Sequence, residues 1–206
     1  MRDPDPHAVD GGEVLGLRFD VFGVLDREFL RPYYVLLHAI RPTREGEKRL
    51  RVHKHTIPVF VPLRELEAKY LPVSGGEQNL VRLARELRRG LVSFHRRREA
   101  VERMKREAEN ARDEIGVREV RDVDPSAREF EMTFEDESVA KVRIDIDGTI
   151  LNAVVRTSPT DGSGERREGV GRRKRDLERV IFGGNGRIDS LPQRLRDKNW
   201  AEQRGA

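Results

Sequence analysis

The stretch Phe29–Pro72 reads FLRPYYVLLHAIRPTREGEKRLRVHKHTIPVFVPLRELEAKYLP, and it decides the fold of the first half of the chain. Residues 31–40 and 50–57 are rich in β-branched and aromatic side chains and therefore predict two strands. Between them, residues 42–47 (PTREGE) are of the types that form turns, so the two strands are predicted to pair as a hairpin. The stretch contains no recognisable set of catalytic groups and is typical of a recognition scaffold.

The residues on either side of this hairpin extend the predicted fold. Residues 14–22 alternate apolar and other side chains and predict a half-buried strand, which completes an antiparallel meander. Pro58 and Pro62 predict a rigid turn at which the sheet ends, because proline cannot donate a hydrogen bond to a sheet ladder. Residues 63–70 follow as a short amphipathic helix, which Pro72 ends.

The longest predicted element is a helix from about residue 77 to residue 114, with an apolar residue at every seventh position. The charged residues Arg96–Arg98 interrupt its second apolar position. One interpretation is that this helix packs on its own sheet and then bridges to a second module. The other is that its second half packs against a helix of a partner protein. The residues that would form such a partner interface are Phe94, Val101, Met104, Ala108 and Ile115.

The second half of the chain repeats the order of strands followed by helices. The predicted strands are 117–123, 130–134, 142–146 and 150–157, and the predicted helices are 172–182 and 188–203, the last with Leu191, Leu195 and Trp200 as buried anchors. This order predicts an α+β fold of two tandem modules joined by the long helix. The predicted parts are a disordered lead-in at 1–13, a first module at 14–115, and a second module at 116–206 with a flexible basic loop at 158–171.

The composition bounds the class of protein. Charged residues make up 38% and hydrophobic residues 36% of the 206 residues, so two small modules with modest cores fit better than one thick core. There are no cysteines, which excludes disulfides, thiolate metal sites and cysteine nucleophiles. No apolar run approaches the roughly 20 residues that cross a bilayer, and residues 1–13 lack the apolar region of a signal peptide. An intracellular protein is therefore predicted.

Charge is unevenly distributed along the chain. Residues 116–164 carry 6 basic and 11 acidic groups, whereas residues 165–206 carry 12 basic and 7 acidic groups. Such a division predicts that distinct faces of the protein meet distinct partners.

Three short motifs resemble ligand sites but have simpler interpretations. His53 and His55 could ligate zinc from one face of a strand, but nothing nearby offers the remaining ligands, so a surface or packed histidine pair is predicted. Asp145–Gly148 (DIDG) resembles the start of a calcium loop, but Arg156 stands where the bidentate acid is needed, so a hairpin turn is predicted. Gly183–Gly186 lacks the Lys-Ser/Thr of a phosphate loop and is predicted to connect two helices. No catalytic residue, metal or cofactor is predicted.

The densest basic cluster has three interpretations. An import receptor could read it as a nuclear-import signal, DNA phosphates could contact it, or it could be a solvated loop. Its residues are Arg166, Arg167, Arg172, Arg173, Lys174 and Arg175, of which the last four are the candidate contact residues.

Several stretches of the first module match one family closely. They are Arg31–Leu37 (RPYYVLL), Leu50–Pro58 (LRVHKHTIP), Pro62-Leu63 with Tyr70-Leu71-Pro72, and the helix that carries Leu87-Arg-Arg and Phe94-His. On these residues the chain resembles the centromere protein O family, whose members are subunits of the inner kinetochore and, in yeast, of the COMA complex. The match covers about Gly16 to Met104, and beyond Gly116 it rests on the order and length of the elements.

The resemblance implies tandem RWD domains, which are small α+β modules that serve as platforms for protein interactions. The spacing of Pro58 and Pro62 is similar to the proline turn of RWD domains, with Ile57 in place of the usual tyrosine. The resemblance further implies a heterodimer with centromere protein P, a place beside proteins Q and U in the constitutive centromere-associated network, and localisation at the centromere in the nucleus. The family also carries an N-terminal coiled coil and a leading helix. The short, largely polar segment before Val14 leaves no room for these, so the chain is expected to be a shortened form.

Together these features predict a non-enzymatic scaffold of the inner kinetochore that supports kinetochore assembly and chromosome segregation during cell division. The alternative is a basic nucleic-acid-binding protein that uses Arg96–Arg98 and Arg172–Arg175. An enzyme comes third, because the ubiquitin-conjugating enzymes that share RWD-like folds need a catalytic cysteine and this chain has none.

Overall fold

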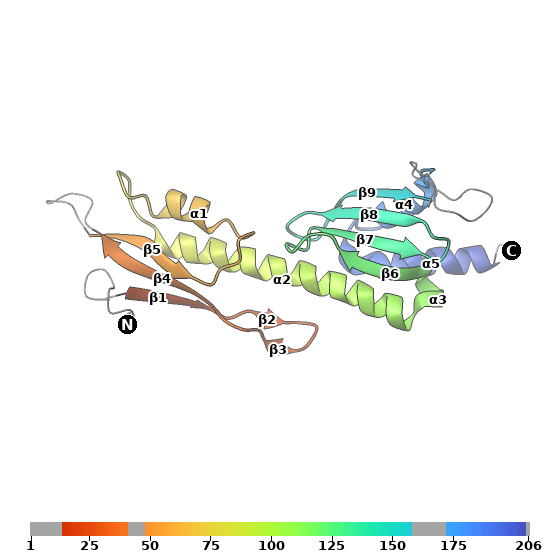
Figure 1. Cartoon of the computed structure of the whole chain (residues 1–206), viewed down its shortest axis with the longest axis horizontal. Coiled ribbons are helices and arrows are strands. Elements are labelled where there is room, and N and C mark those ends of the chain that lie inside the picture. Colours follow the sequence, from red (N-terminus) through yellow and green to blue (C-terminus); the bar gives the residue numbers. More distant parts are fainter. Residues whose placement is uncertain (1–13, 41–47, 158–171, 205–206) are drawn as a thin grey trace. The chain divides into compact units, whose positions relative to one another are not determined.

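The chain folds into two compact units (Figure 1). The computed structural model describes residues 14–40, 48–157 and 172–204, the last without the side chains of 200–204. The first unit ends at Val92 and the second begins at Ser93, both within the long helix α2 (Leu80–Asn110). Each unit has an antiparallel sheet that packs one face against helices, which confirms the predicted α+β class and the long joining helix. The predicted module boundary near Gly116 stays a prediction.

The main sheet of the first unit has three antiparallel strands in the order β1-β4-β5. These are β1 (Val14–Phe19), β4 (Tyr33–Ile40) and β5 (Arg49–His55). They confirm the predicted meander, although the predicted turn at 42–47 lies outside the described residues. A β-bulge between Leu36 and Leu37 shifts the register of β4 against β5.

A second, short hairpin follows β1 where the sequence predicted one continuous strand over 14–22. In it, β2 (Phe22–Gly23) pairs with β3 (Glu28–Phe29), and the N–H of Leu30 donates to the carbonyl of Val21 over 2.9 Å. The chain therefore leaves β4 after Phe19 and pairs with its own continuation, a change of partner that alternation of apolar residues cannot reveal.

The proline turn joins the sheet to the helices as predicted. The N–H of Val61 donates to the carbonyl of Pro58 over 3.0 Å, and Pro62 stands immediately before α1 (Leu63–Tyr70). Proline suits this position because the backbone N–H groups at the start of a helix have no partner within it.

The outer edge of β5 is occupied by side chains from the segments that follow it. Gln78 accepts from the N–H of Leu50 over 2.8 Å and donates to its carbonyl over 2.9 Å. Glu67 accepts from the N–H of Val52 over 2.8 Å. Side chains thus satisfy backbone groups that would otherwise invite another strand to pair here.

The core of the first unit lies between one face of this sheet and the two helices. Val35 and Leu37 of β4 are fully buried, and so are Leu83, Leu87 and Leu91 on α2. The helical leucines recur at intervals of four, so they form one apolar stripe that faces the sheet.

The second unit begins with the latter part of α2 and contains a four-stranded antiparallel meander followed by helices, in the predicted order. Its further elements are α3 (Arg112–Ile115), β6 (Val117–Asp122), β7 (Glu129–Phe134), β8 (Val139–Ile144), β9 (Ile150–Arg156), α4 (Arg175–Phe182), the short 3₁₀ helix η2 (Ile188–Ser190) and α5 (Leu191–Arg204). The predicted flexible loop at 158–171 lies outside the described residues.

The two glycine motifs of this unit form turns, as predicted. Gly148 has φ 84°, and the carboxylate of Asp145 accepts from the N–H groups of Asp147 and Thr149, both over 2.8 Å. Gly184 and Gly186 have φ of 63° and 64° in the connection after α4. Both motifs therefore serve backbone geometry that glycine adopts without strain.

The core of the second unit lies between α2, α4 and α5 and the inner face of the sheet. Phe130 and Met132 of β7 are buried there, as are Leu191 and Leu195 of α5, which confirms two of the three predicted anchors. The side chain of the third, Trp200, lies outside the described residues.

Candidate interaction surfaces

The predicted partner seam of α2 is buried within the second unit. The exposed fractions are 6% for Phe94, 1% for Val101, 0% for Met104, 3% for Ala108 and 1% for Ile115. The last four belong to the core that packs on β6–β9. Their apolar row is filled by the chain's own sheet, so the partner interface predicted for them has no exposed surface in the structure. The arrangement follows the other interpretation of this helix, in which it packs on its own sheet.

Arg97 accounts for the charge that interrupts the apolar row of α2. Its side chain is 4% exposed, and its guanidinium donates to the carbonyl of Ile146 over 2.8 Å and to that of Ser126 over 3.2 Å. It also donates to the hydroxyl of Ser93 over 3.1 Å. Burial, with a further contribution from Arg128, lowers the pKa of the Arg97 guanidinium.

Arg97 therefore ties α2 to the β6–β7 and β8–β9 connections. It is not available to nucleic acid, which corrects the alternative prediction that used Arg96–Arg98 as one contact surface. Its Nε has no hydrogen-bond partner among the described residues.

The basic segment 172–175 is not the solvated loop of one interpretation, and the helix predicted from residue 172 begins only at Arg175. The N–H of Arg172 donates to the hydroxyl of Thr157 over 2.9 Å, and the N–H of Lys174 donates to the carbonyl of Val155 over 2.9 Å. Arg173 forms an isolated bridge with Arg156 at the end of β9. The backbone of this segment thus adds to the edge of the second sheet, because β9 leaves its outer hydrogen-bonding groups available.

Two of the four basic side chains in this segment already bind carboxylates. Nε of Arg173 donates to both oxygens of Glu178 over 2.6 and 2.9 Å, and Lys174 forms an ion pair with Asp136. Glu178 is 6% exposed and also accepts from the N–H of Val155 over 3.0 Å. The hydrogen bond from Arg173, helped by that of Val155, holds the pKa of Glu178 below its usual range.

Arg172 and Arg175 remain exposed, and Arg175 opens onto a hollow beside α4. The hollow has a volume of about 350 Å³, and its lining residues are Arg173, Arg175, Glu178, Arg179 and Phe182. Phe182 is 40% exposed, which gives the hollow an aromatic wall among guanidinium groups. Such a site suits an anionic group attached to an apolar one.

An exposed aromatic pair on the β2–β3 hairpin was missed from the sequence. The rings of Phe22 and Phe29 meet edge to face with centroids 5.4 Å apart, although the residues are 50% and 70% exposed. Val24, on the same hairpin, is 60% exposed. Clustered exposed apolar side chains of this kind mark surfaces that other proteins cover.

The two histidines that could have ligated zinc, His53 and His55, lie among described residues that offer no further ligands. His53 lies at the bulge of the first sheet and packs edge to face on His38, with ring centroids 5.2 Å apart, while His55 is exposed. Within the described ranges, no group of three or more potential ligands could hold a metal ion. In the same ranges, no helix is long and apolar enough to span a membrane.

The fold and these surfaces define a class of protein: two small α+β units on a shared helix, with exposed aromatic and arginine-rich surfaces suited to binding other macromolecules. The Cenp-O kinetochore centromere component family matches residues 1–195 by its sequence profile. The chain belongs to this family and is a component of the kinetochore at the centromere. No curated protein matches the chain.

Proposed function

We propose that this protein is a non-enzymatic structural subunit of the inner kinetochore that forms a heterodimer with centromere protein P. The observation that carries the proposal is the family match over residues 1–195, which covers the first compact unit and most of the second. The two units are proposed to be tandem RWD domains, an assignment supported by the proline turn of Pro58 and Pro62 between sheet and helix. The proposed place of action is the centromere in the nucleus, beside centromere proteins Q and U.

Exposed apolar side chains on the first unit support an obligate partner. Phe22, Val24 and Phe29 stand at least half exposed on one short hairpin. Since isolated soluble proteins rarely leave such side chains clustered in water, a partner that covers this hairpin would stabilise the protein.

Co-expression with centromere protein P tests this proposal. A 1:1 complex measured by size-exclusion chromatography with light scattering is the expected result. The double variant Phe22→Ser/Phe29→Ser is expected to weaken it, whereas Val59→Ser, which changes another exposed apolar residue of the first unit, serves as the matched control. A wild-type protein that remains a folded, unaggregated monomer in the presence of centromere protein P would refute the proposal.

Nucleic-acid binding is the second candidate function, and the hollow beside α4 is the observation that favours it. Arg175 and Arg179 are exposed beside Phe182, and Arg172 is exposed nearby. Because Arg173 and Lys174 already bind carboxylates, only part of the cluster predicted from the sequence could meet phosphates.

Replacing Arg172 and Arg175 with alanine separates the interpretations of this segment. DNA contact predicts weaker binding and a salt dependence that flattens by about 0.9 per lost phosphate contact. A nuclear-import signal predicts reduced nuclear accumulation of the variant with complex assembly intact. If neither DNA affinity nor localisation changes, both interpretations are withdrawn.

A further inference from the structure

The two edge strands of the first sheet differ in how their backbone groups are used. At the edge formed by β5, the side chains of Gln78 and Glu67 bind backbone groups of the strand. At the opposite edge, β1 pairs with β4 on one side, and among the described residues no segment pairs with its other side. Figure 1 shows β1 at the free edge of this sheet. The first sheet therefore has one covered edge and one open edge.

Hydrogen bonds at the end of β4 show to which side its backbone groups point. The N–H of Thr56, just after β5, donates to the carbonyl of Tyr34 over 2.9 Å. The N–H of Tyr34 donates in turn to the hydroxyl of Thr56 over 2.8 Å. The backbone groups of Tyr34 therefore point toward β5. Because successive residues of a strand direct these groups to alternate sides, those of Val35 point toward β1.

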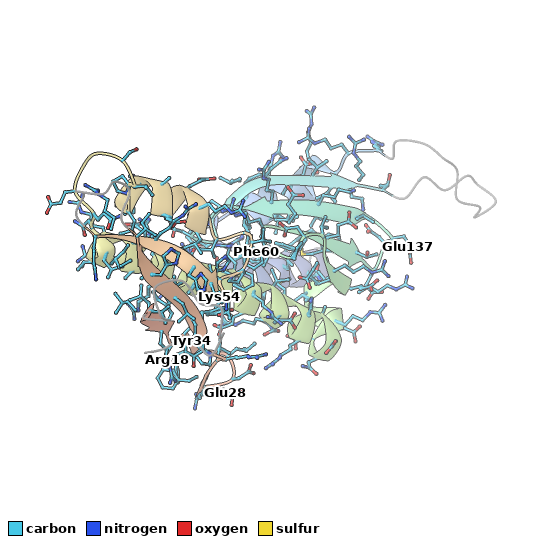
Figure 2. All side chains as sticks on the ribbon, turned by 60° about the vertical axis from the view of Figure 1, so that its left-hand side comes forward. Arg18, Glu28, Tyr34, Lys54, Phe60 and Glu137 are labelled. Carbon is cyan, nitrogen blue, oxygen red and sulfur yellow. The ribbon has the colours of Figure 1, made fainter. Side chains whose placement is uncertain are left out.

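The strand register then shows which backbone groups of β1 point outward. Leu17 lies opposite Val35, so the N–H and C=O of Leu17 point toward β4. Its neighbours Gly16 and Arg18 direct theirs to the opposite side, where the sheet ends. Figure 2 shows Arg18 as the outermost of its labelled residues on the three strands, beside Tyr34. The open edge thus presents donors and acceptors that a further strand could use.

The strand β1 lacks the features that commonly prevent pairing at an open edge. Proteins protect such edges with prolines, β-bulges or charged side chains. The sequence of β1, VLGLRF, contains no proline and pairs with β4 without a shift in register. Its one charged side chain, Arg18, is bound by Asp20, because Nε and Nη2 of Arg18 both donate to Oδ1 of that residue. Gly16 has no side chain that could shield its backbone groups.

The apolar core of the first unit is also incompletely covered at β1. Leu15 lies opposite Leu37 and Leu17 lies opposite Val35, so the four side chains share the face that packs on the helices. Leu37 and Val35 are 0% exposed, whereas Leu15 is 45% exposed and Leu17 is half-buried. A further strand beside β1 would place its own side chains next to Leu15 and Leu17 and cover them.

We propose that the outer edge of β1 pairs with an extended segment of a partner protein, which adds one strand to the first sheet. In such strand addition, main-chain hydrogen bonds provide affinity and alternate side chains provide specificity. The segment carries apolar side chains at every second position, beside Leu15 and Leu17, and polar ones at the positions between. This inference does not depend on which kinetochore protein supplies the strand, nor on the hairpin of Phe22 and Phe29.

The chemistry of the open edge selects an extended polypeptide as its occupant. Another extended backbone presents donors and acceptors that alternate at the same spacing as those of β1. A helix uses its backbone groups internally, so it could not pair with Gly16 and Arg18 in this way. The phosphates of nucleic acids accept hydrogen bonds but do not donate them, so they would leave the outward carbonyl groups without partners.

Fluorescence anisotropy with labelled peptides tests the proposal on the full chain. The probe is a peptide as long as β1, six residues, in which valine alternates with threonine and to which a lysine is added at each end for solubility. Two comparison peptides carry methyl groups on the backbone nitrogens of either the threonines or the valines. The unmodified peptide is expected to bind, and one methylated peptide should bind about tenfold or more weakly because its donors toward β1 are lost. An antiparallel strand would use the threonine N–H groups for this pairing, and a parallel strand those of the valines.

A proline in β1 locates the site. Gly16→Pro removes an outward N–H, a change that edge strands tolerate, and should weaken binding of the unmodified peptide by about tenfold or more. The matched control is Gly16→Ala, which keeps the N–H and should leave the affinity within about twofold. Circular dichroism checks that both variants remain folded. If Gly16→Pro does not fold, the two methylated peptides decide the question on the wild-type chain.

Several results would overturn the proposal. Failure of the unmodified peptide to bind at about 1 mM protein, or equal affinities of the two methylated peptides, would mean that no strand pairs here. Unchanged affinity in a folded Gly16→Pro variant would place the peptide elsewhere. A dimer of the chain alone, detected by light scattering and separated by Gly16→Pro, would assign the edge to a second copy. A gain of affinity on deleting residues 1–13 would assign it to a segment of the same chain. None of these results bears on the complex with centromere protein P, which is measured separately.

Discussion

The outer faces of the two sheets differ in the charged side chains that their strands supply. On the second sheet, acids and bases alternate between neighbouring strands: Glu131 of β7 pairs with Lys141 of β8 at 3.0 Å, and Glu129 pairs with Arg143 at 3.6 Å. The strand register places both pairs directly opposite each other. On the first sheet, the facing strands β4 and β5 offer cations and rings but no acid. The second face pairs its charges between neighbouring strands, whereas the first has no acid within the strands β1, β4 and β5.

This difference concerns how strongly the outer face of each sheet can attract charged partners. Cross-strand ion pairs on an exposed face contribute little stability, but they remove the long-range attraction that would draw in charged partners. The second unit also buries an arginine, Arg97, and an acid, Glu178, each bound by several groups. Arg97 and Glu178 are thus bound within the second unit's own fold, while the exposed ring of Phe182 and its neighbouring arginines lie beside α4.

The largest loss of stability is expected for a substitution in the part of α2 that is buried in the second unit. Replacing Phe94 with alanine should lower the free energy of unfolding by about 3–5 kcal/mol, because the ring is 6% exposed and its removal leaves a cavity. Chemical denaturation monitored by circular dichroism measures this loss. Val123→Ala, at a residue 54% exposed, is the control and should change stability by less than about 0.5 kcal/mol.

Two other results for Phe94→Ala would change the comparison. A change in stability too small to measure would place Phe94 on the surface and reopen the second unit as a binding face. Loss of the proposed complex with centromere protein P at unchanged stability would restore the partner interface that the sequence predicted for this helix.

Substitutions of Glu178 test whether this buried carboxylate stabilises the basic segment 172–175. Glu178→Ala removes the acceptor of Val155 and the partner of Arg173 together, and should cost about 2 kcal/mol. Glu178→Gln keeps an acceptor for Val155 but loses the ion pair, so it should cost less. Urea denaturation measures both variants, and equal costs would mean that the ion pair adds nothing.

The ion pair of Glu178 also predicts a pH dependence. Arg173 lowers the pKa of Glu178 in the folded state, so its contribution is complete above the unfolded pKa of about 4.3. That contribution is lost as the pH falls through the lower, folded pKa. The stability difference between wild type and Glu178→Gln should therefore be full at pH 7 and should shrink below about pH 4.

Gly116 of the second unit and Gly75 of the first both have a positive φ angle. Their φ angles are 65° and 71°, so alanine at either should cost about 1–2 kcal/mol. A Cβ at Gly116 would also lie 2.7 Å from Nδ2 of Asn199, whereas at Gly75 it would meet nothing within 4 Å. Thermal denaturation should thus show the larger loss for Gly116→Ala, and equal losses would mean that Asn199 moves aside at no cost.

The regular elements could be predicted because local patterns decide them. Phe130 and Met132 alternate with half-buried polar residues, and the leucines of α2 recur at helical spacing, so the strands and helices could be predicted from the sequence. The end of β1 at Phe19 could not be predicted from the sequence. The apolar alternation of residues 14–19 continues to Phe22, and only the change of pairing partner separates β1 from β2.

The surfaces were harder to predict than the elements because they depend on which groups meet across the sequence. Arg97 looked like part of a basic patch, but Ile146 and Ser126, far along the chain, supply the carbonyls that bury it. Arg173 and Lys174 belong to the predicted contact cluster, but Glu178 and Asp136 form ion pairs with them. The outer face of the first sheet has one signal in the sequence, the absence of acids from 31–40 and 50–57, which becomes informative once those strands are known to be neighbours.

The smallest expected effect addresses the comparison of the two outer faces directly. Lys141→Glu places two glutamates opposite each other on the second sheet and should cost about 0.5–1 kcal/mol of stability. Arg51→Glu makes the same change on the first sheet, where its cross-strand neighbour is His38, and should cost less because it breaks no pair with a carboxylate in the adjoining strand. Thermal melts at low and high salt separate the two, since screening should reduce the penalty at Lys141 and leave Arg51→Glu nearly unchanged. A larger, salt-sensitive loss for Arg51→Glu would mean that an acid from elsewhere in the chain pairs with the outer face of the first sheet, and the contrast between the two faces would then fail.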